Sequence, residues 1–207
     1  MIMDSSKVKL HYAIAEAIHQ WSEVENSLAF VFAIGLDANL AHNIGTSFAA
    51  FWRLQSFRSK LEVVNSVINT TDISDSLRDE WNSLHNRLSR KNKARNELAH
   101  FKIEHWSNNE PVLVPYSTES KSIADAVAFQ NNTGKDHREM NGRKALYAHD
   151  VWQRSESFIS LHKDLSAFCP KLNVERHVKR QGVTTVLKEG SVRTAPPAGM
   201  KSSRTKK

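Results

Sequence analysis

Residues 74–101 read SDSLRDEWNSLHNRLSRKNKARNELAHF, and this stretch decides the fold class. Its large apolar residues recur at three- and four-residue spacing, which is the period of one helix face. They are Leu77, Trp81, Leu84 and Leu88. Ser74 or Asp75 suits the N-cap of such a helix, and no proline interrupts it. The stretch therefore predicts a long amphipathic helix that packs its apolar face against other helices.

The same helical period appears in three further parts of the chain. Apolar residues predict a first helix over about residues 10–36. Two shorter amphipathic runs within residues 40–68 predict a second helical region, broken into two. A last helix is predicted over about residues 147–168, with Pro170 as its stop. The fold class expected is therefore all-α, a bundle of four or five helices in which residues 74–100 form the third helical region.

A short β-hairpin is predicted directly after this third helix. Residues 102–106 and 112–114 carry β-branched and aromatic side chains, and they flank the turn-forming stretch 107–111. Polar residues dominate from Ser117 to about Arg143, where we expect a long loop with some helix around residues 123–129. The bundle is thus expected to contain a hairpin insertion.

The positive charge of the chain is concentrated at its C-terminal end. The net charge is +7, and residues 173–207 hold nine Lys and Arg against two Asp and Glu. Residues 1–172 therefore carry as many acidic as basic side chains. Few large apolar residues follow Leu172, so this part is expected to be a disordered basic tail. The domains predicted are a helical domain over 1–172 and the tail over 173–207.

Cysteine usage and hydropathy suggest a cytoplasmic location. The one cysteine, Cys169, rules out an internal disulfide framework. The first residues show no signal-peptide pattern, and the most apolar stretch, residues 28–36, is too short to span a bilayer. We therefore expect a soluble, cytoplasmic protein without a membrane partner.

The third helix ends in the hexapeptide Arg95-Asn96-Glu97-Leu98-Ala99-His100. At about 100° per residue, the apolar stripe of the helix continues through the position of Arg95. Arg95 is therefore expected to project from the core-facing side, with Asn96 and His100 on the neighbouring face. A guanidinium, an amide and an imidazole are suited to holding a phosphate, orienting it and moving protons near neutral pH.

A structural role is the alternative explanation of the hexapeptide. Arg and His side chains near a helix C-terminus interact favourably with the macrodipole and with the last free carbonyl groups. Three polar side chains that interrupt an apolar stripe in one place nevertheless favour a functional site.

The stretch Lys93-Ala94-Arg95-Asn96-Glu97-Leu98-Ala99-His100-Phe101 resembles the signature of the HEPN family (higher eukaryotes and prokaryotes nucleotide-binding domains). That signature is an Arg, a polar residue and a His four to six positions after the Arg. The layout over about residues 10–168, with the motif at a helix end before a hairpin, is similar too. Many members are metal-independent ribonucleases, often toxins or phage-defence effectors. Others are inactive binding or dimerisation modules.

The resemblance implies a role for each residue of the motif. His100 would be the general acid and base, Arg95 would stabilise charge on the phosphorane, and Asn96 would orient the phosphate or His100. The products implied are a 2′,3′-cyclic phosphate and a 5′-hydroxyl. The resemblance also implies a homodimer with two motifs facing each other, RNA as a partner and, for a toxin, an antitoxin protein. No metal or other cofactor is expected.

Five further residues are candidates to support the site. Glu25 lies within the apolar stripe of the first helix, and a buried carboxylate needs a partner, so we expect it to pair with Arg95. A basic cluster precedes the motif and could guide RNA to it, although such clusters are usually solvated. The cluster consists of Arg87, Arg90, Lys91 and Lys93.

Two other functions remain open at the level of sequence. One is a non-catalytic helical module for interaction or oligomerisation, in which Arg95 and His100 are structural. The other gives the main nucleic-acid contact to the basic tail, with non-specific binding that weakens as salt rises. Trp106, in the predicted hairpin, is the aromatic residue best placed to stack on a base.

Overall fold

The computed structural model describes residues 5–36, 44–105, 111–115, 139–140 and 143–190. Within these ranges the helices are α1 (Ser5–Gly35), α2 (Ile44–Arg53), α3 (Phe57–Thr70), α4 (Asp75–His100) and α6 (Ala148–Gly190). Strand β1 (Phe101–His105) pairs with β2 (Pro111–Pro115), and β3 (Glu139–Met140) pairs with β4 (Arg143–Lys144). The prediction of an all-α bundle with a hairpin is confirmed. The helix expected around residues 123–129 and Trp106 lie outside the described residues.

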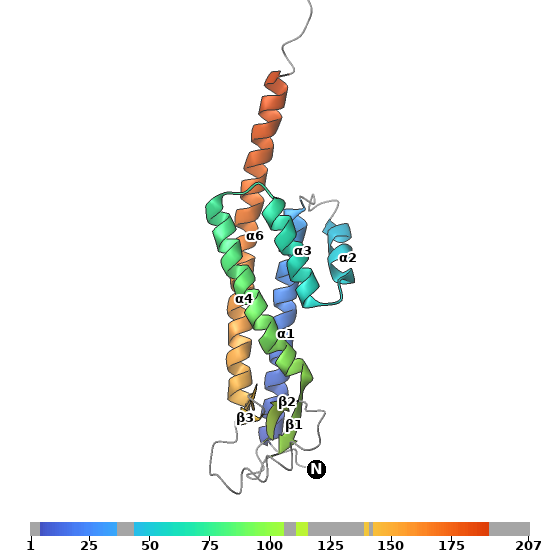
Figure 1. The fold of residues 1–207 in the computed structure, drawn as a ribbon, viewed down its shortest axis with the longest axis vertical. Helices are drawn as coiled ribbons and strands as arrows, with labels where there is room; N and C mark the ends of the chain where they lie inside the picture. The colour runs from blue at the N-terminus through green and yellow to red at the C-terminus, as the bar shows by residue number, and fades with distance from the viewer. Residues whose placement is uncertain (1–4, 37–43, 106–110, 116–138, 141–142, 191–207) are drawn as a thin grey trace, which may run out of the picture.

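Helices α1 and α6 run parallel and side by side along the long axis of the molecule (Figure 1). Residues at the start of α1 meet the start of α6, as in the ring contact of Tyr12 with Trp152. Farther along, Ser27 Oγ lies 2.8 Å from His162 Nδ1. The buried positions recur about every 3.5 residues on both helices, which is the spacing of a coiled-coil seam. They include Leu10, Ala13, Ala17, Val24, Val31 and, on α6, Val151, Phe158, Leu165 and Leu172.

Helix α4 packs antiparallel to α6 through the apolar stripe that the sequence shows. Leu77, Trp81, Leu84 and Leu88 are all buried. Ser74 is the N-cap, and its side chain accepts a hydrogen bond from the backbone N–H of Leu77. An N-cap serine satisfies a backbone donor that has no partner within the helix, which fixes where α4 begins. The cap fixes the start of α4 and the stripe fixes the face that packs on α6, and α4 then leads directly into the hairpin.

The hairpin follows α4 without a connecting loop. The backbone N–H of Phe101 caps α4 by donating to the carbonyl of Glu97, and Phe101 is the first residue of β1. Antiparallel pairing sets Phe101 opposite Pro115 and Ile103 opposite Leu113. Leu113 also exchanges backbone hydrogen bonds with Leu146, just before α6. The end of α4 is thereby tied to the start of α6.

Helix α6 does not stop at Pro170, so that prediction was wrong. Pro170 lies inside α6, which continues to Gly190 and projects beyond the other helices (Figure 1). A proline inside a helix costs about 3 kcal/mol, because a backbone donor is lost and the ring crowds the preceding turn. Leu172, just beyond it, is fully buried. The burial of Leu172 and the polar contacts made by the residues after it offset this cost.

Polar contacts tie the part of α6 beyond Leu172 to the bundle. Arg176 donates to the carbonyl of Gly35 at 2.7 Å, where α1 ends. The Glu175 carboxylate accepts from the backbone N–H of Ser74 at 2.7 Å, and Lys179 forms an ion pair with Asp72. The helical region therefore extends past the boundary expected at residue 172.

Deleting residues 173–207 is expected to lower the free energy of unfolding by about 2–3 kcal/mol, because the hydrogen bonds that the charged side chains of Arg176 and Glu175 make with backbone groups of the bundle are lost. Deleting only residues 191–207 keeps these contacts and serves as the matched control. Urea denaturation followed by circular dichroism measures both. Equal stability of the two truncated chains would show that the contacts beyond Leu172 do not contribute.

Within the described residues, no helix is long and apolar enough to cross a membrane.

Candidate functional site

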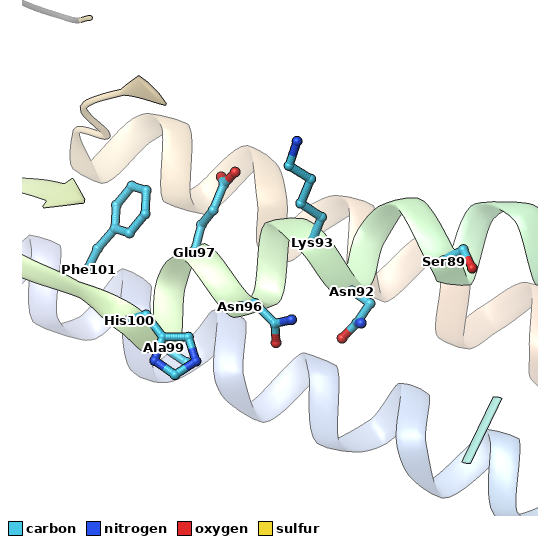
Figure 2. A pocket seen from close by; sticks show the side chains of 8 residues that line it. All are labelled: Ser89, Asn92, Lys93, Asn96, Glu97, Ala99, His100 and Phe101. Atoms are coloured by element: carbon cyan, nitrogen blue, oxygen red, sulfur yellow. The ribbon is translucent and has the colours of Figure 1, made fainter. Parts of the chain in front are cut away.

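An open pocket of about 710 Å³ lies at the C-terminal end of α4. Its lining comes from the last three turns of the helix and from the first residue of β1. The lining residues are Ser89, Asn92, Lys93, Asn96, Glu97, Ala99, His100 and Phe101. In Figure 2 the side chains of Asn92, Asn96 and His100 point to the same side of α4, whereas those of Lys93 and Glu97 point to another side. The four-residue spacing of Asn92, Asn96 and His100 thus brings two amides and an imidazole together.

His100 is exposed and makes no hydrogen bond or ion pair with any residue that the structure describes. The backbone cap at the end of α4 is made by the N–H of Phe101 and does not use the imidazole. His100 is therefore free to contact a ligand in the pocket.

Arg95 does not line this pocket but contacts Asn96, which does. Its side chain is half-buried, and its NH1 group donates to Asn96 Oδ1 at 3.3 Å. Its Nε atom is buried and has no hydrogen-bond partner among the described residues, and the same holds for Asn92 Oδ1, one turn earlier. Buried polar atoms without a partner are rare in folded proteins, and each calls for an explanation. The last turns of α4 therefore hold one hydrogen-bond donor and one acceptor that no described residue uses.

The other residues of the hexapeptide hold the helix in place. Leu98 is buried in the core. Glu97 forms an ion pair with Arg154 of α6 at 2.7 Å, and Arg154 also donates to the carbonyl of Ala94 at 2.9 Å. Arg154 thus fixes the motif-bearing turns of α4 against α6. Sequence reasoning missed Arg154, because a partner so distant along the chain leaves no local pattern.

The predicted pairing of Glu25 with Arg95 was wrong. Glu25 forms an ion pair with Lys60 of α3 at 2.6 Å, and its other carboxylate oxygen accepts from Trp21 Nε1 at 2.9 Å. The Lys60 ammonium also lies 4.1 Å from the ring centre of Trp52. The carboxylate is partnered as expected, but by α3, so it joins the core of the bundle and does not hold the motif.

The structure divides the four cations that the sequence groups together. Lys93 lines the pocket. Arg87 instead forms an ion pair with Asp164 of α6 at 2.7 Å. Burial lowers the pKa of Lys91, and so do the positive charges around it, which belong to Arg154, Arg87 and Arg90. Arg87 and Lys91 therefore lie with Arg154 toward α6, whereas Arg90 is exposed at the edge of this group.

The described residues offer neither a metal cluster nor a reactive thiol. No group of three or more His, Cys, Asp or Glu side chains in the described ranges is arranged to hold a metal ion. Burial raises the pKa of the Cys169 thiol to about 11, so the thiolate needed for nucleophilic attack is scarce at neutral pH. The hexapeptide and its pocket remain the leading candidate site.

Comparisons of the chain with models of protein families, with curated proteins and with solved structures find no match.

Proposed function

We propose that this chain is a HEPN-like protein that binds RNA in the pocket at the end of α4 and cleaves it without a metal ion. The observation that carries the proposal is that His100 and Asn96 line one open pocket, with the Arg95 guanidinium bonded to Asn96. The resemblance of the hexapeptide to the HEPN signature supplies the class of reaction, and the exposed imidazole supports it.

The chemistry follows from the three side chains. Neutral His100 takes the proton from a ribose 2′-hydroxyl, and the 2′-oxygen forms a bond to the adjacent phosphorus. Negative charge grows on the phosphorane oxygens, where the Arg95 guanidinium stabilises it, and Asn96 fixes the direction of that guanidinium. The bond to the 5′-oxygen then breaks, and this oxygen takes up a proton. The products are a 2′,3′-cyclic phosphate and a 5′-hydroxyl.

A homodimer would complete this site. Its described lining comes from one helix and one strand residue, so one side of the pocket is open to a partner. A two-fold contact between identical faces would set two motifs opposite each other and double the number of imidazoles and guanidinium groups. One imidazole could then take the 2′ proton while the other protonates the leaving oxygen.

The test is incubation of a labelled single-stranded RNA with the purified chain in EDTA, followed by analysis of the product ends. We expect cleavage that leaves 2′,3′-cyclic phosphate and 5′-hydroxyl ends, and much slower cleavage by Arg95→Ala. Products with 3′-hydroxyl ends, or cleavage by Arg95→Ala at the normal rate, would contradict the proposed roles.

Exposed aromatic side chains favour a second candidate, a non-catalytic interaction module. Tyr12 is 62% exposed, and its ring lies 5.7 Å from that of Trp152. Phe30 is 44% exposed and packs edge-on against Phe48 of α2. Exposed aromatic groups of this kind are typical of protein–protein contacts. Absence of RNA cleavage together with self-association that depends on Tyr12 and Phe30 would favour this candidate.

A further inference from the structure

Two ion pairs join α4 to α6, and one of their four residues, Glu97, also lines the edge of the pocket. Arg87 of α4 pairs with Asp164 of α6, and Glu97 of α4 pairs with Arg154 of α6, each at 2.7 Å. The two pairs are ten residues apart on α4 and also ten residues apart on α6. Ten residues correspond to about 15 Å of helix rise. The two helices therefore run antiparallel and side by side over this length, with a salt bridge at each end.

Lys91 lies between these two salt bridges. It follows Arg87 by one helical turn on the same side of α4 and is half-buried. It makes no hydrogen bond or ion pair with a described residue, and both nearby acids already pair with arginines. The positive groups gathered here are Arg87, Arg90, Lys91 and Arg154, which we call the α4–α6 cation cluster. Among the described residues, these four cations pair with two carboxylates, Asp164 and Glu97.

A partly buried cation such as Lys91, with other cations beside it, is unfavourable unless an anion joins it. Burial, and after it the charges of Arg154, Arg87 and Arg90, lowers the pKa of Lys91, because both disfavour the protonated amine. Arginine forks and a lysine ammonium are the side chains that proteins use to bind phosphate. The cluster is therefore complementary to a phosphate group.

We propose that the α4–α6 cation cluster is a phosphate-binding site that holds the backbone of an RNA whose scissile bond lies in the pocket. The identification of the anion as RNA rests on the proposed function. Phosphate binding itself does not, because it depends only on the charges and positions of the four cations.

An RNA that reaches from the pocket to the α4–α6 cation cluster crosses the outer face of α4. At about 100° per residue, Lys91 and His100 lie about 180° apart around the helix. Lys93 and Arg90 have angular positions between them on the solvent side, and both are exposed. A helix with its side chains is about 10–12 Å wide. An octanucleotide is long enough to span that width and reach both sites.

The first test is NMR titration of the lysine Cε resonances in the intact chain, with the Lys91 signal assigned by its loss in Lys91→Gln. Two probes are added separately: inorganic pyrophosphate and an octanucleotide of 2′-O-methyl RNA, which cannot be cleaved through a 2′-hydroxyl. We expect the titration midpoint of Lys91 to rise with either probe. A rise with pyrophosphate alone would overturn the assignment to RNA, and a rise with neither would overturn the site.

The second test is the affinity of the 2′-O-methyl octanucleotide for Lys91→Gln, measured by fluorescence anisotropy over a range of salt. We expect the affinity to fall about three- to tenfold. The slope of the logarithm of the binding constant against the logarithm of the salt concentration should fall in magnitude by about one, as for the loss of one phosphate contact. Lys9→Gln, which removes an exposed lysine from α1, is the matched control and should bind normally. Circular dichroism confirms that both variants fold.

The two proposals can fail separately. If Lys91 responds to the octanucleotide but the intact chain cleaves no RNA, the phosphate site stands and the proposed nuclease activity falls. If the chain cleaves RNA with the expected ends but Lys91→Gln binds and titrates like the control, the nuclease stands and the phosphate site is wrong.

Discussion

His100→Ala is expected to lower the rate of RNA cleavage by about 10²- to 10⁴-fold, the range that general acid–base catalysis by one side chain contributes. The fold should be unaffected, because the His100 imidazole is exposed and bonds to no described residue. Cleavage is measured as initial rates on a labelled single-stranded RNA in EDTA, and stability as the melting temperature by circular dichroism.

The matched control is His19→Ala, which removes an exposed imidazole from α1. It should cleave RNA at the rate of the unmodified chain. If His100→Ala and His19→Ala have the same activity, His100 is not the general acid or base.

Lys60→Met is expected to lower the free energy of unfolding by about 3 kcal/mol. Removing one member of a buried ion pair leaves the other charge without compensation, and such losses are typically about 3–5 kcal/mol. The side chains of Lys60 and Glu25 are only 8% and 14% exposed. The substitution also removes the cation from its place near the Trp52 ring. Urea denaturation followed by tryptophan fluorescence measures the change.

The double variant Glu25→Gln with Lys60→Met separates the buried charge from the loss of packing. It should be more stable than Lys60→Met alone, because no unpaired carboxylate remains and the glutamine can still accept the hydrogen bond from Trp21 Nε1. Lys163→Met, at an exposed position of α6, should change stability little. A Lys60→Met variant as stable as Lys163→Met would show that the ion pair contributes nothing.

Local patterns were enough to predict most of the fold. The stripe from Leu77 to Leu88 and the N-cap at Ser74 predicted α4, and both are present in the structure. β-Branched and aromatic residues on both sides of the turn-forming stretch 107–111 predicted the hairpin, whose pairing joins Phe101 to Pro115. These features depend on interactions between residues close in sequence, so a sequence alone can reveal them.

The course of α6 beyond Pro170 could not be predicted in this way. Proline opposes a helix locally, but Leu172 is buried and Arg176 bonds to the carbonyl of Gly35 at the end of α1. Such contacts join residues that are distant in the chain, and they outweigh the local preference. The same reason explains why the sequence showed that Glu25 needs a partner but not that the partner is Lys60.

The sequence predicted which residues of α4 share the candidate site, but not the residue of α6 that holds this part of α4 in place. The interval from Asn96 to His100 places both side chains on one face, and both line the pocket. Arg154, which holds Glu97 and the carbonyl of Ala94, gave no signal because it approaches from α6. Lys93 and Lys91 looked like one basic cluster, but positions two residues apart on a helix point about 160° apart.

In the proposed reaction, a ribose 2′-hydroxyl attacks the phosphate in the pocket at the end of α4. The most direct measurement uses two labelled RNAs of identical sequence, one of which carries a single 2′-deoxynucleotide on the 5′ side of the cleaved bond. The chain should cleave the all-ribose strand in EDTA and leave a 2′,3′-cyclic phosphate, and it should leave the 2′-deoxy junction intact. Cleavage of the 2′-deoxy junction at the same rate would contradict this mechanism.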